Sequence, residues 1–145
     1  MPQIIDMRGY IALLIALALW REAEGEGRDG LTGVACVMAN RARRNGGDWF
    51  AVLTAPNQFS SMSVRGDART VAWPSPKDGV FPTCIALANA ALAGTLADTT
   101  GGATEYENPA TATSAWFAQA IQSGKLTPTV TIGRHVFYKE SAPHV

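Results

Sequence analysis

The stretch YIALLIALALWREAEGEG, residues 10–27, decides the fold of this chain. Most of its residues favour a helix, none before Gly25 breaks one, and Gly25 is a suitable helix stop. A helix that is apolar on nearly every side must lie inside a protein. Its last turn then carries Glu22, and with it Glu24, from a dry core towards a surface, where a carboxyl group can keep its proton near neutral pH. The sequence therefore predicts a central N-terminal helix with a candidate acid at its end.

A simpler interpretation of these carboxylates is open. Acidic residues that follow a hydrophobic helix are usually solvated, and at the C-terminus of a helix they oppose its macrodipole. Composition alone favours this interpretation. Helical spacing places Glu22 on the face of Ile15 and Glu24 on the face of Leu17. Both faces are apolar, so the spacing does not choose between the two carboxylates.

The composition indicates one ordinary domain that spans residues 1–145. The chain is 47% hydrophobic and 17% charged, which is enough to bury a single core without cross-links. Twelve basic and twelve acidic residues cancel, so no field attracts a polyanion, and nucleic acid is not an expected partner. The apolar run is too short to span a bilayer and lacks the flanks of a signal peptide. We expect no stable membrane association, with a short export signal as the minor alternative.

Cysteine and histidine give no sign of a metal or cofactor. Cys36 and Cys84 each lie in an apolar helical pattern, where a free cysteine behaves as a small hydrophobe, and a bridge between them has no support. The two histidines, His135 and His144, show no ligand spacing. We therefore expect neither a zinc site nor any other cofactor.

The remaining pattern predicts a mostly helical α+β domain in which the later half forms a small antiparallel sheet. The proline-rich stretch 54–82 is expected to be a loop that partly walls a groove, although a tolerated surface excursion is about as well supported. Asp6 would cap the first helix, and Gly133 would join the last two strands as a hairpin. Helices are expected at about 6–23, 29–44, 48–53, 81–93 and 113–123, and strands within 101–109 and at about 129–132 and 134–138.

Five motifs resemble those of the SleB/CwlJ-type cell wall hydrolases, which include spore-cortex-lytic enzymes and phage relatives. Each motif alone is weak, but five in the same order, over roughly residues 10–140, make a specific signal. The matching segments are Glu22–Glu26, Val34–Arg41, Gln58–Ser60, Gly102–Pro109 and Ile132–Tyr138.

The resemblance implies a lysozyme-like fold and cleavage of the β-1,4 bond between N-acetylmuramic acid and N-acetylglucosamine in peptidoglycan, usually as a lytic transglycosylase. The family's catalytic glutamate falls on Glu22, because Glu24 matches a variable position and Glu26 the second glutamate of the motif. The chain departs from the family at Arg21, where alanine is usual, and in the loop 59–82, which does not align. An Arg21 side chain turned inward would favour the ionised form of Glu22.

Further residues are expected to contact the sugar chain through the same resemblance. Glu26 would tune or orient the site, with a plain structural role nearly as well supported. Strand alternation places Thr104, Tyr106 and Asn108 on one side. Without the resemblance, a core role for Tyr106 and a turn-capping role for Asn108 are equally well supported. The expected substrate-binding residues are Glu26, Gln58, Ser60, Thr104, Tyr106 and Asn108.

The other histidine and tryptophan residues are assigned to the structure. His135 is expected to be a hydrogen-bonded structural residue at the hairpin, not a base. Trp20, Trp49 and Trp116 are expected in the core rather than as sugar platforms.

Three activities fit the expected site. A lytic transglycosylase needs one carboxyl group, here Glu22, which gives its proton to the glycosidic oxygen and then takes the proton of the muramic C6 hydroxyl. A hydrolytic muramidase needs a second carboxylate, for which Glu26, Glu105 and Glu107 are candidates. A non-catalytic peptidoglycan-binding module is the alternative from another class. The expected setting is a monomeric phage lysin, held in the host cytoplasm until it is released to the cell wall; a prophage-derived bacterial relative would look the same.

Overall fold

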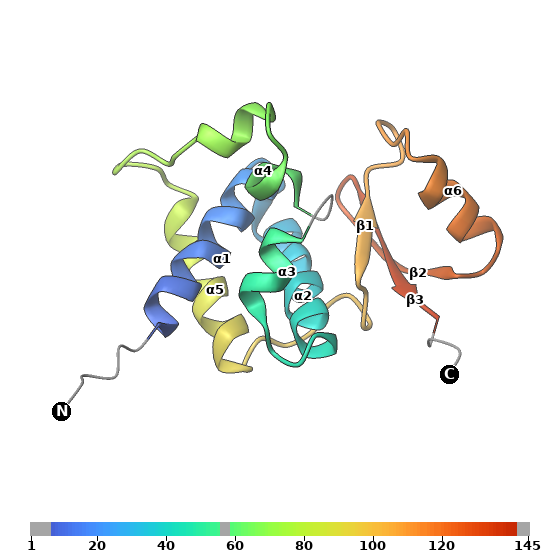
Figure 1. Ribbon diagram of the computed structural model, residues 1–145, viewed down its shortest axis with the longest axis horizontal. Helices are drawn as coiled ribbons and strands as arrows, with labels where there is room; N and C mark the ends of the chain where they lie inside the picture. Colours follow the sequence, from blue (N-terminus) through green and yellow to red (C-terminus); the bar gives the residue numbers. More distant parts are fainter. Residues whose placement is uncertain (1–6, 56–58, 142–145) are drawn as a thin grey trace.

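The N-terminal helix is the pillar of a helical body. The computed structural model describes residues 7–55 and 59–141 (Figure 1). Helix α1 packs along α5 and also contacts α2 and α3. The body consists of α1 (Arg8–Ala23), α2 (Gly27–Arg44), α3 (Trp49–Thr54) and α5 (Phe81–Ala93). These bounds confirm the helices that the hydrophobic periodicity predicts.

Burial along α1 changes midway. Every residue from Ile15 to Arg21 is buried, whereas Tyr10 and Leu13 are half exposed. A helix buried throughout is therefore the wrong expectation for the first turns, which lie at the rim of the body (Figure 1). The expected cap, Asp6, lies outside the described residues. The C-terminal half, which carries Glu22, is the part that the core holds in place.

One continuous apolar core joins these helices. It includes Leu19 from α1, Met38 from α2 and Leu87 from α5. Phe59 extends it into the loop that follows α3. Cys36 and Cys84 are buried and free, as expected. Across the described ranges, no helix combines the length and the apolar character that crossing a bilayer requires.

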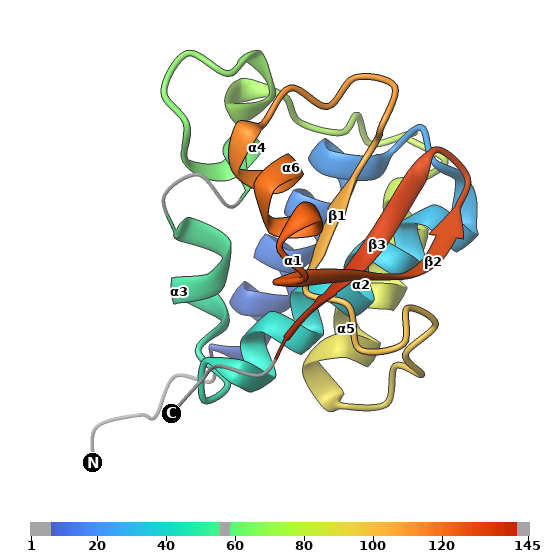
Figure 2. The same cartoon turned by 90° about the vertical axis from the view of Figure 1, so that its right-hand side faces the viewer.

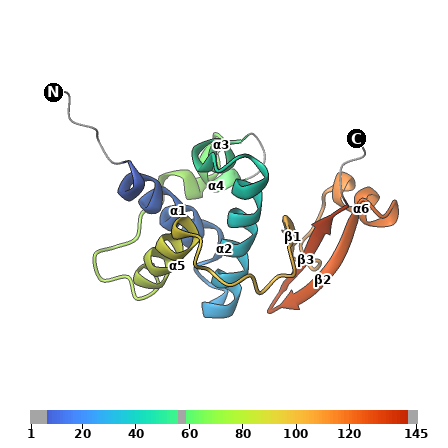
Figure 3. The same cartoon turned by 90° about the horizontal axis from the view of Figure 1, so that it is seen from below.

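The later half of the chain forms an antiparallel sheet with the strand order β1-β3-β2. Phe137 of β3 packs against Val37 of α2 and joins the sheet to the body, while α6 packs on β2. Gly133 adopts a positive φ of 58° in the β2–β3 turn, which confirms the predicted hairpin. The elements are β1 (Glu105–Glu107), α6 (Ala115–Gln122), β2 (Leu126–Ile132) and β3 (His135–Glu140). Figure 2 and Figure 3 show this half on one side of the body, so the predicted α+β class is correct.

The proline-rich loop folds over the end of α1 that carries Glu22. It contains two short helices, α4 (Ser60–Ser63) and η1 (Ala68–Val71). Arg21 holds the loop: its Nε donates to the carbonyl oxygen of Ala72 at 2.9 Å and its Nη1 to that of Ser61 at 3.2 Å. Arg21 thus turns inward, but towards backbone carbonyls. The cation that pairs with Glu22 within the described residues is Arg69.

Candidate active site

The carboxylate of Glu22 is enclosed by groups from the loop. Its side chain is only 11% exposed. Oε1 accepts hydrogen bonds from Ser61 Oγ at 2.6 Å and from Ser61 N at 3.3 Å, and Oε2 accepts one from Arg69 Nη1 at 3.2 Å. Glu24, in contrast, is exposed. The fold therefore distinguishes two carboxylates that helical spacing alone does not.

Arg69 is itself fixed by a neighbouring acid. Its Nη2 donates to Asp67 Oδ2 at 2.7 Å and its Nε to Asp67 Oδ1 at 3.1 Å. The hydrogen bond to Asp67 does most to raise the pKa of Arg69 above its usual value, and Glu22 adds to this effect against the opposing effect of burial. A fixed positive charge therefore faces one oxygen of Glu22.

Ser61 and Arg69 were missed by the sequence reasoning. Both lie in the loop that does not align with the resembled family, and the motif there ends one residue earlier, at Ser60. The Asp67-Ala68-Arg69 run was the available signal, because Asp67 also accepts from the backbone N–H of Arg69 and starts η1. Gln58 and the side chain of Ser60 lie outside the described part of the chain.

Glu26 points to the β2–β3 hairpin. Its side chain is 12% exposed, Oε1 accepts from Arg134 Nη2 at 2.6 Å, and Oε2 lies 3.9 Å from His135 Nδ1. Glu26 thus links the start of α2 to the sheet. This contact fits the structural role that the sequence left as the alternative, and a role of Glu26 in substrate binding stays a prediction.

His135 is packed among rings. Its ring centroid lies 5.1 Å from that of Tyr106, edge to face. Nδ1 is buried and has no hydrogen-bond partner within the described residues, although it lies 3.9 Å from Glu26 Oε2. Burial lowers the pKa of His135 below its usual value, Glu26 opposes that shift and Arg134 adds to it.

The three expected residues of the first strand region have different surroundings. Tyr106 is half-buried between His135 and Phe137, and burial, with the charge of Glu22 second, raises the pKa of its hydroxyl. Thr104 is buried. Asn108 Oδ1 accepts from Ala110 N at 3.0 Å and caps the turn after β1. Tyr106 therefore belongs to the surroundings of Glu22, whereas Asn108 performs the turn-capping role.

The three tryptophans also differ. Trp20 and Trp49 are buried in the main core, as expected. Trp116 is 48% exposed, so its assignment to the core is wrong. Helix α6 packs on β2 through other residues, and the Trp116 side chain stays half exposed.

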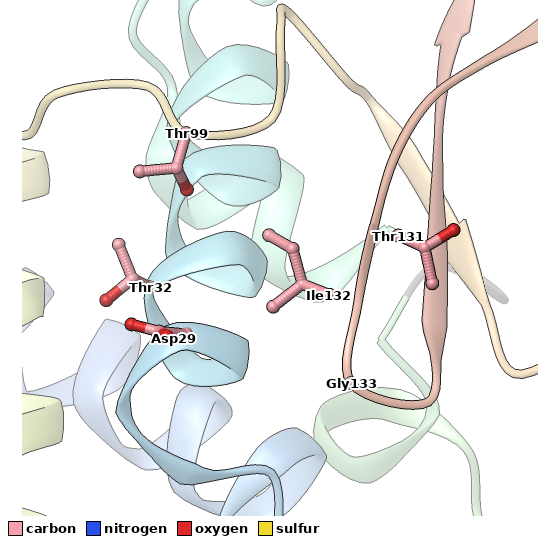
Figure 4. Close-up of a pocket in the computed structure, with 6 residues that line it drawn as sticks. All are labelled: Asp29, Thr32, Thr99, Thr131, Ile132 and Gly133. Carbon is pink, nitrogen blue, oxygen red and sulfur yellow. The ribbon is translucent and has the colours of Figure 1, made fainter.

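A pocket of about 410 Å³ lies between α2 and the β2–β3 hairpin (Figure 4). Asp29 and Thr32 border it from α2, and Thr131 and Ile132 from the hairpin. Thr32 Oγ1 already donates to the carbonyl oxygen of Arg28 at 2.8 Å. Among the described residues, no cluster of His, Cys, Asp or Glu could hold a metal ion.

Comparisons with known proteins agree with this arrangement. A model of the family described as cell wall hydrolase matches residues 25–138. The catalytic domain of the germination-specific lytic transglycosylase SleB from Bacillus anthracis is similar, with a TM-score of 0.68 and 26% identity over 96% of this chain and 100% of that chain. The catalytic domain of Bacillus cereus SleB gives a TM-score of 0.66 and 27% identity over 95% of this chain and 94% of that chain. No curated protein sequence matches.

These similarities confirm the lysozyme-like α+β fold that the motifs imply. The match to the family model begins at residue 25, beyond Glu22. The assignment of Glu22 therefore depends on its motif and on its contacts with Ser61 and Arg69.

Proposed function

This chain belongs to the cell wall hydrolase family, and from that premise we propose that it cleaves the glycan strands of peptidoglycan as a lytic transglycosylase with Glu22 as its acid. The expected bond is the β-1,4 bond between N-acetylmuramic acid and N-acetylglucosamine. The supporting observation is the enclosed carboxylate of Glu22, which Ser61 and Arg69 hold at the buried C-terminal end of α1.

In the first step, protonated Glu22 gives its proton to the glycosidic oxygen, and the bond between this oxygen and muramic C1 breaks. In the second step, the Glu22 carboxylate takes the proton of the muramic C6 hydroxyl, whose oxygen forms a bond to C1. The product is a 1,6-anhydro ring, and Glu22 ends protonated, as it began. One carboxyl group is sufficient for both proton transfers.

The surroundings of Glu22 fit both protonation states. Arg69 stabilises the carboxylate that acts in the second step. When Glu22 carries the proton, the charge of Arg69 stays balanced by Asp67, which accepts from Arg69 Nε and Nη2. Ser61 Oγ is both a donor and an acceptor, so it can hold Glu22 in either state.

The candidate second carboxylates, Glu26, Glu105 and Glu107, contact residues of the β2–β3 hairpin, α2 and β3, whereas the groups that hold Glu22 come from the loop 59–82. This separation favours the single-acid mechanism. Glu26 pairs with Arg134 at 2.6 Å, and Glu105 pairs with Arg41 at 2.8 Å. Glu107 Oε1 accepts from the Tyr138 hydroxyl at 3.5 Å. A hydrolytic muramidase would need one of them as a nucleophile or as a base for water.

The test is the substitution Glu22→Gln, which keeps the shape and removes the titratable proton. We expect the rate at which the protein clears purified peptidoglycan sacculi to fall by roughly 10²- to 10⁴-fold. The decrease in turbidity measures this rate. Glu24→Gln is the matched control, because it removes an exposed carboxylate two positions away on the chain and should clear at the normal rate. Equal clearing by Glu22→Gln and the unmodified protein would overturn the assignment of the acid.

Mass spectrometry of the released fragments separates the alternatives. Anhydromuramic ends are the expected result. Reducing ends would mean hydrolysis, in which case Glu26→Gln should lower the rate as far as Glu22→Gln does. Binding to sacculi without any clearing by the unmodified protein would favour a non-catalytic peptidoglycan-binding module.

We also propose that the protein acts as a monomer, without stable membrane association, and that as a lysin it waits in the host cytoplasm until released to the cell wall. The contacts of Glu22 with Ser61 and Arg69 all come from one chain. Light scattering should give the mass of one chain. Expression inside a bacterium should lyse the cells only when the inner membrane is opened by a second agent.

A further inference from the structure

A second pocket, of about 400 Å³, lies where the C-terminal end of α2 meets the sheet and α6. We call it the Trp116 pocket. Arg41 and Arg44 line it from α2, Thr104 and Glu105 from the β1 region, Trp116 from α6 and Glu140 from β3.

Two buried donors in this wall lack partners. Thr104 is 4% exposed, and its Oγ1, like Arg41 Nη1, is buried with no hydrogen-bond partner in residues 7–55 and 59–141. The rest of the Arg41 guanidinium is fixed, because Nε donates to the Thr104 carbonyl oxygen at 2.6 Å and Nη2 to Glu105 Oε2 at 2.8 Å. Buried polar groups without partners reduce stability, so two of them beside one pocket point to a ligand that supplies an acceptor.

The charges of the wall cancel. Arg41 pairs with Glu105 at 2.8 Å, and Arg44 pairs with Glu140 at 2.7 Å. Each arginine that lines the pocket is thus paired with a carboxylate and is not left to bind an anion, while Lys125 adds a cation beside Trp116. The chemistry therefore favours an uncharged ligand that carries hydrogen-bond acceptors.

Trp116 supplies an apolar surface beside these donors. It is half exposed, while Phe117, next to it, is buried under α6 together with Leu126 and Tyr138. Lys125 Nζ lies 5.4 Å from the ring centroid of Trp116. A flat indole next to polar donors suits the C–H face of a sugar ring whose substituents form hydrogen bonds.

The Trp116 pocket is linked to the surroundings of Glu22. The Arg41 guanidinium lies over the ring of Phe59, 4.8 Å from its centroid, and Phe59 stands two residues before Ser61, which holds Glu22. Thr104 lies two residues before Tyr106. The charge of Glu22 contributes to the raised pKa of the Tyr106 hydroxyl. The wall of the Trp116 pocket is therefore packed against the segments that carry the surroundings of Glu22.

We propose that the Trp116 pocket is a sugar subsite that holds an uncharged N-acetylated hexosamine of the glycan strand, away from the bond that is cleaved. The sugar ring lies on Trp116, and its acetamide oxygen accepts from Arg41 Nη1 and Thr104 Oγ1. This proposal rests on the proposed function, because it assumes that the glycan is the substrate.

The probe is an uncharged tetramer of β-1,4-linked N-acetylglucosamine, which carries no peptide, and its affinity is measured by titration calorimetry. Trp116→Ala should weaken binding by roughly 10-fold. Phe50→Ala is the matched control, since Phe50 is equally exposed on α3 and does not line this pocket; its affinity should be unchanged.

Thr104→Val separates a binding role from a structural one, because valine keeps the shape and removes the hydroxyl. We expect two effects of opposite sign: weaker tetramer binding, by roughly 3- to 10-fold, and a higher melting temperature of the free protein, because a buried hydroxyl without a partner is removed. A purely structural Thr104 would leave the affinity for the tetramer unchanged.

Unchanged affinity of both Trp116→Ala and Thr104→Val would overturn the proposal. It would also be overturned if these variants bound the tetramer normally but lost affinity for a free stem peptide, because the pocket would then serve the peptide. The proposed function fails separately: if Glu22→Gln clears sacculi normally, the acid is wrong, and tetramer binding still decides the subsite.

Discussion

The acid of the helical body and two polar atoms of the sheet half differ in their hydrogen bonding. On the body side, Glu22 accepts three hydrogen bonds from Ser61 and Arg69. On the sheet side, Thr104 Oγ1 and His135 Nδ1 are buried without a partner in the described part of the chain. The protein itself therefore positions the acid, whereas Thr104 Oγ1 and His135 Nδ1, like Arg41 Nη1 of α2, receive no hydrogen-bond partner from the described residues.

The apolar cores of the body and of the sheet half also differ. The body has one large continuous core, while the sheet half has two small clusters, one around Leu126 and one around Phe137. Matched substitutions in the two halves therefore test whether the body is packed more tightly than the sheet half.

The largest expected effect is the loss of core leucines. Leu19 in the body and Leu126 in the sheet half are 0% and 1% exposed. Leu19→Ala should lower the free energy of unfolding by about 4 kcal/mol, and Leu126→Ala by about 2 kcal/mol, because a small cluster at a strand end can collapse around the cavity more completely. Urea denaturation measures both. An equal or larger loss at Leu126 would show that the sheet half is packed as tightly as the body.

The junction between the halves should tolerate no added atom. A Cβ at Gly33 would lie 2.7 Å from Phe137 Cζ and 3.3 Å from Ile132 Cδ1. Gly33→Ala should therefore lower the free energy of unfolding by about 1–3 kcal/mol, despite the better helix propensity of alanine. The control is Gly9→Ala in α1, where nothing lies within 4 Å and a gain of up to about 1 kcal/mol is expected. A gain at both positions in thermal unfolding would contradict a tight junction.

Asp98 lies in the segment that joins α5 to β1, and its carboxylate links this segment to α2 through Asn40. Although partial burial raises the pKa of Asp98, hydrogen bonds from Thr100, Asn40 and Gly102 outweigh it and hold the pKa below its usual value. Asp98→Asn should lower the free energy of unfolding by about 1–2 kcal/mol at pH 7. Glu24→Gln, at an exposed carboxylate, should change it little.

The pH dependence checks the role of Asp98. A lowered folded pKa gives stability that is present above the unfolded value, about 3.9, and is lost as the pH falls through the folded value. The difference in the free energy of unfolding between the unmodified protein and Asp98→Asn should therefore become smaller below pH 4. A difference that stays constant down to pH 2 would mean that the charge of Asp98 is not what stabilises the link.

The smallest effect concerns His135. Because burial lowers its folded pKa, the unfolded chain takes up the proton first as the pH falls through about 6.5, and the folded state loses stability. His135→Gln titrates in neither state, so its stability should fall less between pH 7 and pH 5. Identical slopes in denaturation series at these pH values would remove His135 from the acid response.

The sequence alone determined the elements whose pattern is local. Periodicity predicted α1, α2 and α5, and Gly133 marked the hairpin, because helix faces and turn conformations depend on neighbours within a few residues. The same local pattern misplaced Trp116: helical spacing shows an apolar face, but not whether another element covers it.

Only the tertiary structure decided the partners of the acid. Ser61 and Arg69 lie 39 and 47 residues from Glu22 along the chain, in a loop whose sequence has no period, and the fold of this loop over α1 depends on the contacts of Arg21. It also decided that Glu22 is enclosed and Glu24 exposed. The physical reason is that burial and hydrogen bonding at these carboxylates depend on distant segments, which no local spacing records.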